Sequence, residues 1–120
     1  MSQLQKLSIK MLEYIDQIED RYKQGRDTGE KGDFYLEVKP FADKVKQDND
    51  KWKAEAEKWI KDNSPKGLRI QQIQSAYDQM DTSSIQAFFP ETSKSRFTNQ
   101  VNSAKYVVQR LLVLIEEKES

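Results

Sequence analysis

Apolar residues recur at steps of three and four along most of the chain, and glycines and prolines interrupt this pattern at three places. The interruptions leave four segments, at residues 2–24, 33–63, 69–89 and 93–118. A spacing of three and four places the apolar residues on one face of a helix. Each segment is therefore predicted to form an amphipathic helix.

The apolar stripe is clearest in the first and last segments. In the first, it consists of Leu4, Leu7, Met11, Tyr14 and Ile18. In the last, it consists of Phe97, Val101, Ala104, Val108, Leu111 and Ile115, without a polar exception. The third segment has a shorter stripe of Ile70, Ile73, Tyr77 and Met80. Gly25 follows the first stripe and is predicted to end that helix, because glycine readily adopts the left-handed conformation of a helix C-cap.

The second segment contains two possible interruptions. Asp33 is a suitable N-cap, and the apolar phase from Phe34 continues past Pro40 to Trp52 and Trp59. This continuity predicts one long helix that is kinked near Pro40, because proline lacks the N–H of the helical hydrogen bond. The sequence Asp-Asn-Asp at 48–50 could alternatively cap a restarted helix. We favour one continuous helix, because both tryptophans remain in phase.

Four amphipathic helices joined by short links pack well as an antiparallel, up-and-down four-helix bundle. The predicted fold class is therefore all-α. The length of 120 residues corresponds to one domain, and we assign residues 1–120 to it. A chain of this size can bury enough surface to form its own core.

Antiparallel packing would bring most of the aromatic residues to one end of the bundle. These residues are Tyr22, Phe34, Tyr35, Phe41, Phe88, Phe89 and Phe97. One interpretation is that large rings fill a wide end of the core. The other is that some of them line a cleft for a ligand, with nearby cations as polar partners. The candidate binding residues at this end are Phe34, Lys39, Phe89 and Arg96.

The composition argues against several classes of function. Lys and Arg together number 20, as do Asp and Glu, and no basic block is present, so nucleic acid is not an expected partner. No polybasic amphipathic stretch or long apolar run indicates a membrane partner. The N-terminus has no apolar run typical of a signal peptide. We therefore expect a cytoplasmic protein.

No catalytic or metal-binding constellation is evident, so no catalytic residue, metal ligand or cofactor is assigned. The chain has no cysteine and no histidine, which removes thiolate chemistry and the commonest general base and metal ligand. A di-metal site in a helical bundle typically uses Glu-x-x-His motifs, which require histidine. A serine nucleophile would need lysine as its base, and Ser93-Lys94-Ser95 is too weak a signal to indicate one.

Scattered residues along nearly the whole chain resemble the YppE-like family. They are DFYLEVKPF at 33–41, Trp52, Pro65, Gln72-Ile73, KSRF at 94–97 and Tyr106. This family comprises small bacterial proteins of unknown function from the bacillus group. The resemblance implies an all-helical four-helix bundle and implies no reaction or cofactor. It also marks Lys39-Pro40 and Arg96-Phe97, at the aromatic end, as family-like positions.

Two hypotheses about function follow. The first is a non-enzymatic protein–protein interaction module of the bacterial cytoplasm, present as a monomer or weak homodimer, whose protein partner is unknown. The alternative is a small-molecule-binding protein or enzyme with an aromatic-lined pocket. That pocket would be formed by Phe34, Phe41, Phe88 and Phe97.

Overall fold

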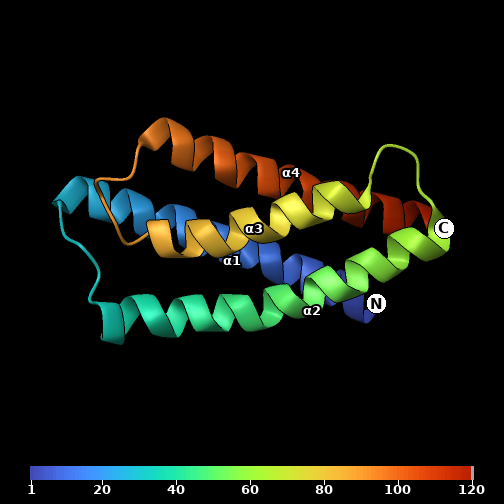
Figure 1. The fold of residues 1–120 in the computed structure, drawn as a ribbon, viewed down its shortest axis with the longest axis horizontal. Helices are drawn as coiled ribbons and strands as arrows, with labels where there is room; N and C mark the ends of the chain where they lie inside the picture. Colours follow the sequence, from blue (N-terminus) through green and yellow to red (C-terminus); the bar gives the residue numbers. More distant parts are fainter. Residues whose placement is uncertain (120) are drawn as a thin grey trace.

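Four long α-helices and one π-helical turn account for most of the computed structural model, which describes residues 1–119. The elements are α1 (Gln3–Thr28), the π-helical turn η1 (Phe34–Val38), α2 (Lys39–Asn63), α3 (Ile70–Gln86) and α4 (Lys94–Glu119). Successive helices run in opposite directions, and the molecule is elongated, at 46 × 26 × 22 Å (Figure 1). The predicted all-α bundle is confirmed.

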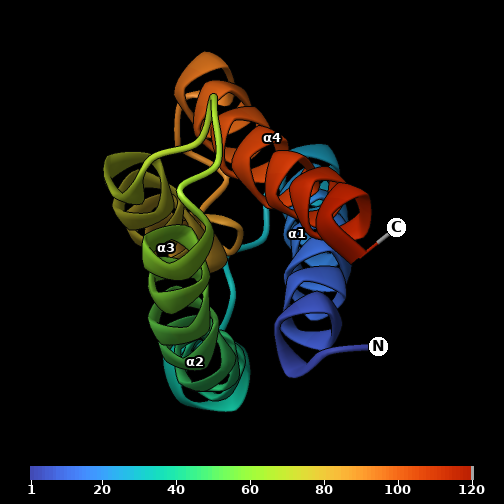
Figure 2. The same ribbon diagram turned by 90° about the vertical axis from the view of Figure 1, so that its right-hand side faces the viewer.

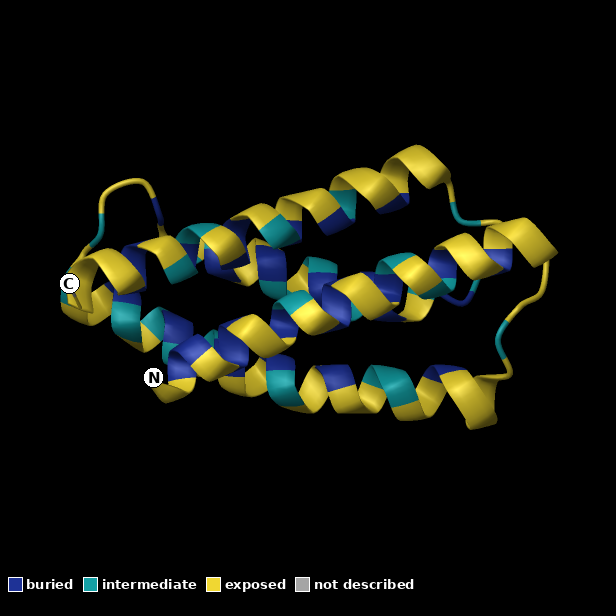
Figure 3. Ribbon diagram, turned by 180° about the vertical axis from the view of Figure 1, so that it is seen from behind, coloured by how far each residue is buried: buried dark blue, intermediate teal, exposed yellow. Residues whose placement is uncertain are grey.

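Each helix packs against the helix before and after it in the chain, and α1 and α4 close the ring. Seen from the end, α2 and α4 therefore lie at opposite corners of the bundle (Figure 2). Buried residues recur along the side of each helix that faces the interior (Figure 3). All of the stripe residues predicted for the first and last helices are buried. The three-four spacing therefore identified the core faces of these two helices correctly.

The C-terminal end of α1 differs from the prediction. The helix passes through Gly25 and ends at Thr28, and Gly29 is the left-handed C-cap, with φ of 74°. The amide of Gly29 donates a hydrogen bond to the carbonyl of Gly25 at 2.7 Å. A Cβ atom on Gly25 would lie 3.5 Å from the ring of Pro90, which is an ordinary van der Waals contact. Gly25 therefore lies within the last turns of the helix and accepts the capping hydrogen bond, rather than ending the helix.

The start of the second helical segment confirms the cap and shows how the helix accommodates its proline. The carboxylate of Asp33 accepts hydrogen bonds from the amides of Tyr35 and Leu36, at 3.0 and 2.9 Å. The amide of Lys39 then bonds to the carbonyl of Phe34, five residues back, as in a π-helix. Pro40 falls in the first turn of α2, where a helix tolerates the missing N–H. Beyond it, α2 is continuous through residues 48–50, as predicted.

Gly32 lies where the link between α1 and η1 touches the core. Its amide donates to the carbonyl of Phe88 at 3.0 Å, and an added Cβ would lie 2.7 Å from the Phe88 ring. We expect Gly32→Ala to lower the free energy of unfolding by about 1–3 kcal/mol, the usual cost of overpacking. Chemical denaturation of the purified variant measures this loss.

Gly29→Asn is the matched control for Gly32→Ala. Gly29 has open space around its Cα, and asparagine tolerates its left-handed conformation better than most residues. The control is expected to remain within about 0.5 kcal/mol of the unsubstituted protein. Equal stability of the two variants would show that the Phe88 contact does not constrain the link.

Candidate functional site

Aromatic rings pack together in two groups at and near the aromatic end of the bundle. Tyr22 of α1 stacks on Phe97 of α4, with centroids 3.9 Å apart and planes 16° apart. Phe88 meets Phe41 edge to face at 5.7 Å, and Phe41 meets Tyr14 in the same way at 6.1 Å. Such offset and edge-on arrangements are favoured by the quadrupoles of the rings. At most 5% of Tyr22, Phe88 or Phe97 is exposed, so these three rings are part of the core.

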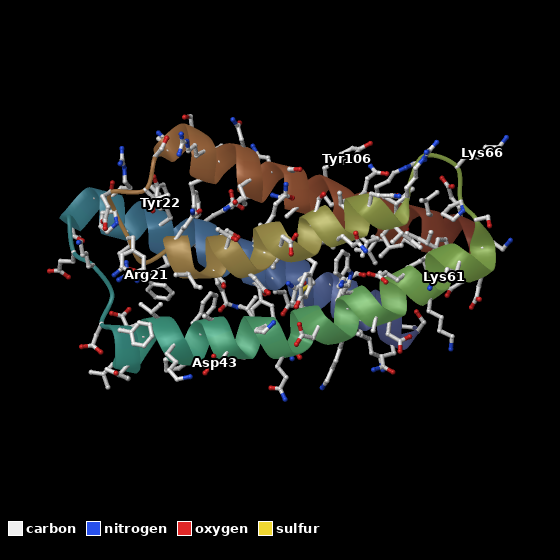
Figure 4. All side chains as sticks on the ribbon, viewed as in Figure 1. Arg21, Tyr22, Asp43, Lys61, Lys66 and Tyr106 are labelled. Atoms are coloured by element: carbon white, nitrogen blue, oxygen red, sulfur yellow. The ribbon has the colours of Figure 1, made fainter. Side chains whose placement is uncertain are left out.

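The four phenylalanines predicted to line a common pocket do not do so. Phe88 and Phe97 are buried, Phe41 is half-buried, and Phe34 is 55% exposed on the outside of the bundle. The guanidinium of Arg21 lies 5.0 Å from the centroid of the Phe88 ring (Figure 4). The interpretation that rings fill the end of the core therefore describes Phe41, Phe88 and Phe97 correctly, but not Phe34.

The π-helical turn exposes three consecutive large apolar side chains. Phe34 is 55% exposed, Tyr35 77% and Leu36 80%, and the rings of Phe34 and Tyr35 are in edge-to-face contact at 5.1 Å. Only Val38 of this turn is buried. Residues 34–36 form what we call the exposed apolar turn. Exposed apolar side chains that lie together, rather than singly, often mark a surface that binds a partner.

The other three candidate binding residues lie apart from one another. Lys39 is exposed, and its ammonium pairs with Asp43 at 2.7 Å on α2. Phe89 is half-buried against the core, in the link that follows α3. Arg96 is exposed on the first turn of α4. Lys39 directly follows η1, which carries the exposed apolar turn, whereas Arg96 is on α4 at the opposite corner of the bundle from α2, so the structure does not bring Arg96 into one site with Lys39 and the turn (Figure 2).

A groove that the sequence did not indicate lies between the end of α1 and the start of α4. It has a volume of about 570 Å³, with Tyr22, Phe97 and Val101 among its lining residues. Its walls carry both acids and bases, which are Glu19, Asp20, Lys23, Arg26, Asp27 and Lys94. The stacked pair of rings is too buried to offer a large contact surface. The mixed charges select no particular class of ligand.

A polar network joins α1 to α2 at the middle of the bundle. The Tyr14 hydroxyl donates to the Asp48 carboxylate at 2.5 Å, and the Lys10 ammonium lies 3.2 Å from the same oxygen. Burial and the hydrogen bond to Asp48 raise the pKa of the Tyr14 phenol. Burial alone would raise the pKa of Asp48, but the bonds from Tyr14 and Lys10 outweigh it and hold that pKa below its usual value. Asp48 therefore accepts hydrogen bonds from α1 and links it to α2, rather than capping a restarted helix.

A second network joins α2 to α3 on the surface. The Tyr77 hydroxyl donates to Asp50, and the Lys46 ammonium lies 3.1 Å from the hydroxyl and 3.4 Å from Asp50. The bond from Tyr77 lowers the pKa of Asp50, and the bond to Asp50 raises the pKa of Tyr77. The same contacts, led by the one with Tyr77, raise the pKa of Lys46. All three groups keep their ordinary charge states at neutral pH, so the network acts as a structural link.

Residues 1–119 contain no group of three or more acidic, histidine or cysteine side chains that is arranged to hold a metal ion. Within the same residues, no helix has both the length and the apolar character needed to cross a membrane. The exposed apolar turn presents three adjacent large apolar side chains to solvent. Its signal in the sequence was the uninterrupted run Phe-Tyr-Leu, which one narrow helical stripe cannot bury completely.

Comparison with known proteins places this chain in a family. A family model described as a bacterial domain of unknown function, DUF1798, matches residues 8–115. The chain belongs to the DUF1798 family. The uncharacterized protein YppE of Bacillus subtilis is 24% identical over 98% of this chain and 95% of its own length. The resemblance to YppE-like proteins is thus confirmed, and the DUF1798 description assigns the family no function.

Several solved structures have the same fold as this chain. The crystal structure of YppE has a TM-score of 0.92 and 23% identity, covering 97% of this chain and 94% of YppE. A Listeria innocua protein of unknown function has a TM-score of 0.91 and 25% identity, covering 97% and 93%. A DUF1798 domain from Staphylococcus aureus has a TM-score of 0.83 and 17% identity, covering 91% and 92%. The four-helix bundle is therefore common to chains of quite different sequence.

Proposed function

We propose that this DUF1798 protein is a non-enzymatic protein-interaction module that binds its partner through the exposed apolar turn. The observation that carries the proposal is the exposure of Phe34, Tyr35 and Leu36, each more than half accessible to solvent. Aromatic and large apolar side chains are the usual anchors of protein interfaces. The absence of histidine and cysteine from the sequence supports a binding role rather than a catalytic one.

The size of the turn favours a concave partner over a second copy of the chain. Three large side chains exposed to this extent offer roughly 400 Å² of surface, about half of what each partner contributes to a standard interface. Two such turns in contact would bury little surface. A groove that encloses the turn on several sides would bury more of it. The partner is therefore a protein with an apolar pocket, and this chain is monomeric on its own.

The charges around the turn indicate the rim of that pocket. Residues 30–43 include four acids and two bases, in a chain whose total charge is zero. Glu37 is paired with Arg21 at 3.3 Å, and Asp43 with Lys39, whereas Glu30 lies on the link beside the turn. A rim of basic residues around the partner's pocket would complement this acidic surrounding.

A triple substitution tests the docking surface. Phe34→Ser, Tyr35→Ser and Leu36→Ser together are expected to abolish capture of the partner from lysate of the native bacterium, with affinity falling by about thirtyfold or more. The substituted side chains are exposed, so the helical circular-dichroism spectrum is expected to remain unchanged. Affinity capture followed by mass spectrometry, and then titration with the purified partner, measures the effect.

Tyr106→Ser is the matched control, because Tyr106 is 59% exposed on α4, far along the chain from the turn. The control is expected to capture the same partner as the unsubstituted protein. Capture of the same proteins by the triple variant, or no specific capture by any form, would refute the proposed surface. Self-association that is lost in the triple variant would instead identify a second copy as the occupant.

A further inference from the structure

The end of the bundle opposite the exposed apolar turn has a groove beside Trp59. The loop of residues 64–69 rises from the end of α2 toward α4 (Figures 1 and 2). The groove has a volume of about 390 Å³ and is lined by residues of α2, this loop and α4, among them Trp59 and Leu114. That volume is within the usual range for small-molecule sites. The feature is independent of the proposed protein-binding turn.

Two left-handed residues shape the loop that forms one wall of this groove. Ser64, with φ of 43°, caps α2, and its amide bonds to the carbonyl of Ile60 at 2.8 Å. Gly67 has φ of 81°, and a Cβ there would lie 3.7 Å from the guanidinium of Arg110. Leu68 is buried in the core directly afterwards and anchors the loop. The turn at Gly67 and the buried Leu68 together place the loop close to Arg110 on α4.

Charges are sorted on the two sides of Trp59. The groove under the loop contains Lys66, Arg110 and Lys118, opposed only by Glu117. A shallower groove, which Trp59 also lines, contains Glu55, Asp62 and Glu119, opposed only by Lys58. Within residues 1–119, none of the three bases under the loop forms an ion pair. Lys66 lies on the loop itself (Figure 4). One side of Trp59 therefore attracts anions, and the other repels them.

From this arrangement we infer that the groove under the 64–69 loop binds a small phosphate monoester that carries a flat ring. The guanidinium of Arg110 suits a phosphate, because it can donate two parallel hydrogen bonds to two phosphate oxygens. Lys66 and Lys118 add charge at the rim. The half-buried indole of Trp59 offers an apolar surface against which a ring can pack. Glu117 disfavours ligands with a second anionic group near the helix end.

Phenyl phosphate is a suitable probe, and the two tryptophans provide a built-in comparison. In a nitrogen–proton correlation spectrum, the indole signal of Trp59 is expected to shift saturably as phenyl phosphate is added. The signal of Trp52, which is fully buried, is expected to stay in place. Benzyl alcohol, a neutral ring compound, is expected to cause no saturable shift at the same concentrations.

Substitution of the cations completes the test. Arg110→Gln is expected to weaken binding by about tenfold or more, as for loss of a charge-assisted hydrogen bond. Lys66→Gln, on the exposed loop, is expected to weaken it less, and Lys6→Gln, on α1 and outside the groove, not at all. An unchanged Trp52 signal reports that each variant is folded. The inference is overturned if phenyl phosphate leaves Trp59 unshifted, if benzyl alcohol acts equally, or if both groove variants bind as the unsubstituted protein does.

Discussion

Trp52→Ala is expected to lower the free energy of unfolding by about 3–5 kcal/mol, the usual cost of removing a fully buried large ring. Trp52 has no exposed surface and lies in the middle of α2, facing the core. Its indole N–H donates to the Ser8 hydroxyl of α1 at 3.0 Å, and Ser8 is also fully buried. The substitution removes a large packing surface and a directional link between two helices. Urea denaturation followed by circular dichroism measures the loss.

Two further variants separate the packing of Trp52 from its hydrogen bond. Trp52→Phe keeps most of the apolar ring but removes the N–H, and we expect a loss of about 1–2 kcal/mol. Trp59→Ala is the matched control, one heptad further along the same helix. Because Trp59 is only partly buried, its loss is expected to be less than half that of Trp52→Ala. If both alanine variants are equally stable, the core is not centred on Trp52.

Asn49→Asp is expected to destabilise the bundle by about 3–5 kcal/mol at neutral pH, although the two side chains have nearly the same shape. Asn49 is fully buried, and its amide nitrogen donates to the carbonyl of Tyr77 at 2.9 Å and to the carboxylate of Asp81 at 3.0 Å. Its own oxygen accepts no hydrogen bond from the described residues. A carboxylate at this position would face two acceptors and have no donor.

The destabilisation by Asn49→Asp should depend on pH in a defined direction. Burial and the neighbouring Asp81 would raise the pKa of the introduced carboxyl in the folded state above its unfolded value of about 3.9. A raised folded pKa means that the loss relative to the unsubstituted protein is smallest below about pH 4, grows as the pH rises toward the folded pKa, and levels off above it. Denaturation of both proteins at several pH values measures this difference.

Comparison at each pH is needed because the parent protein has its own acid dependence. The pKa values of Asp48 and Asp50 are lowered in the folded state, so their contributions are present above the unfolded pKa and disappear as the pH falls. Asn49→Leu is the uncharged control, expected to lose about 1–3 kcal/mol with no comparable pH trend. A pH-independent loss for Asn49→Asp would contradict a buried, uncompensated charge.

Regular periodicity made most of the fold predictable from the sequence. Wherever the α-helical hydrogen-bond pattern holds, steps of three and four identify the buried face, as for Met11, Ile18, Val108 and Leu111. The phase fails at Phe34, because the π-helical turn closes hydrogen bonds five residues back and changes the register before α2 begins. The backbone in that turn is set jointly by Asp33, Pro40 and packing against the core. The helix propensities of single residues do not predict such a combined effect.

The candidate site was less predictable, because it depends on contacts between distant parts of the chain. The aromatic end was correctly expected to gather rings, but the burial of Phe88 and the exposure of Phe34 depend on details of packing. The groove beside Trp59 combines a loop conformation with side chains of two helices. Nothing in the local sequence around Lys66 or Arg110 indicates that these residues line the same groove. The hydrogen-bond partners of buried residues could not be predicted either, because residues such as Ser8 and Trp52 are far apart in the sequence.

At the aromatic end, two side chains of α1 are hydrogen-bonded to the link between α3 and α4. The Tyr22 hydroxyl donates to the carbonyl of Thr92, 70 positions away, and Arg26 donates to the carbonyl of Pro90, 64 positions away. Such bonds cannot form until α1 and this link have come together, so this end of the bundle depends on contacts between residues that are far apart in the chain. The surface presented there is consequently a property of the completed bundle, and a misfolded or truncated chain would not display it.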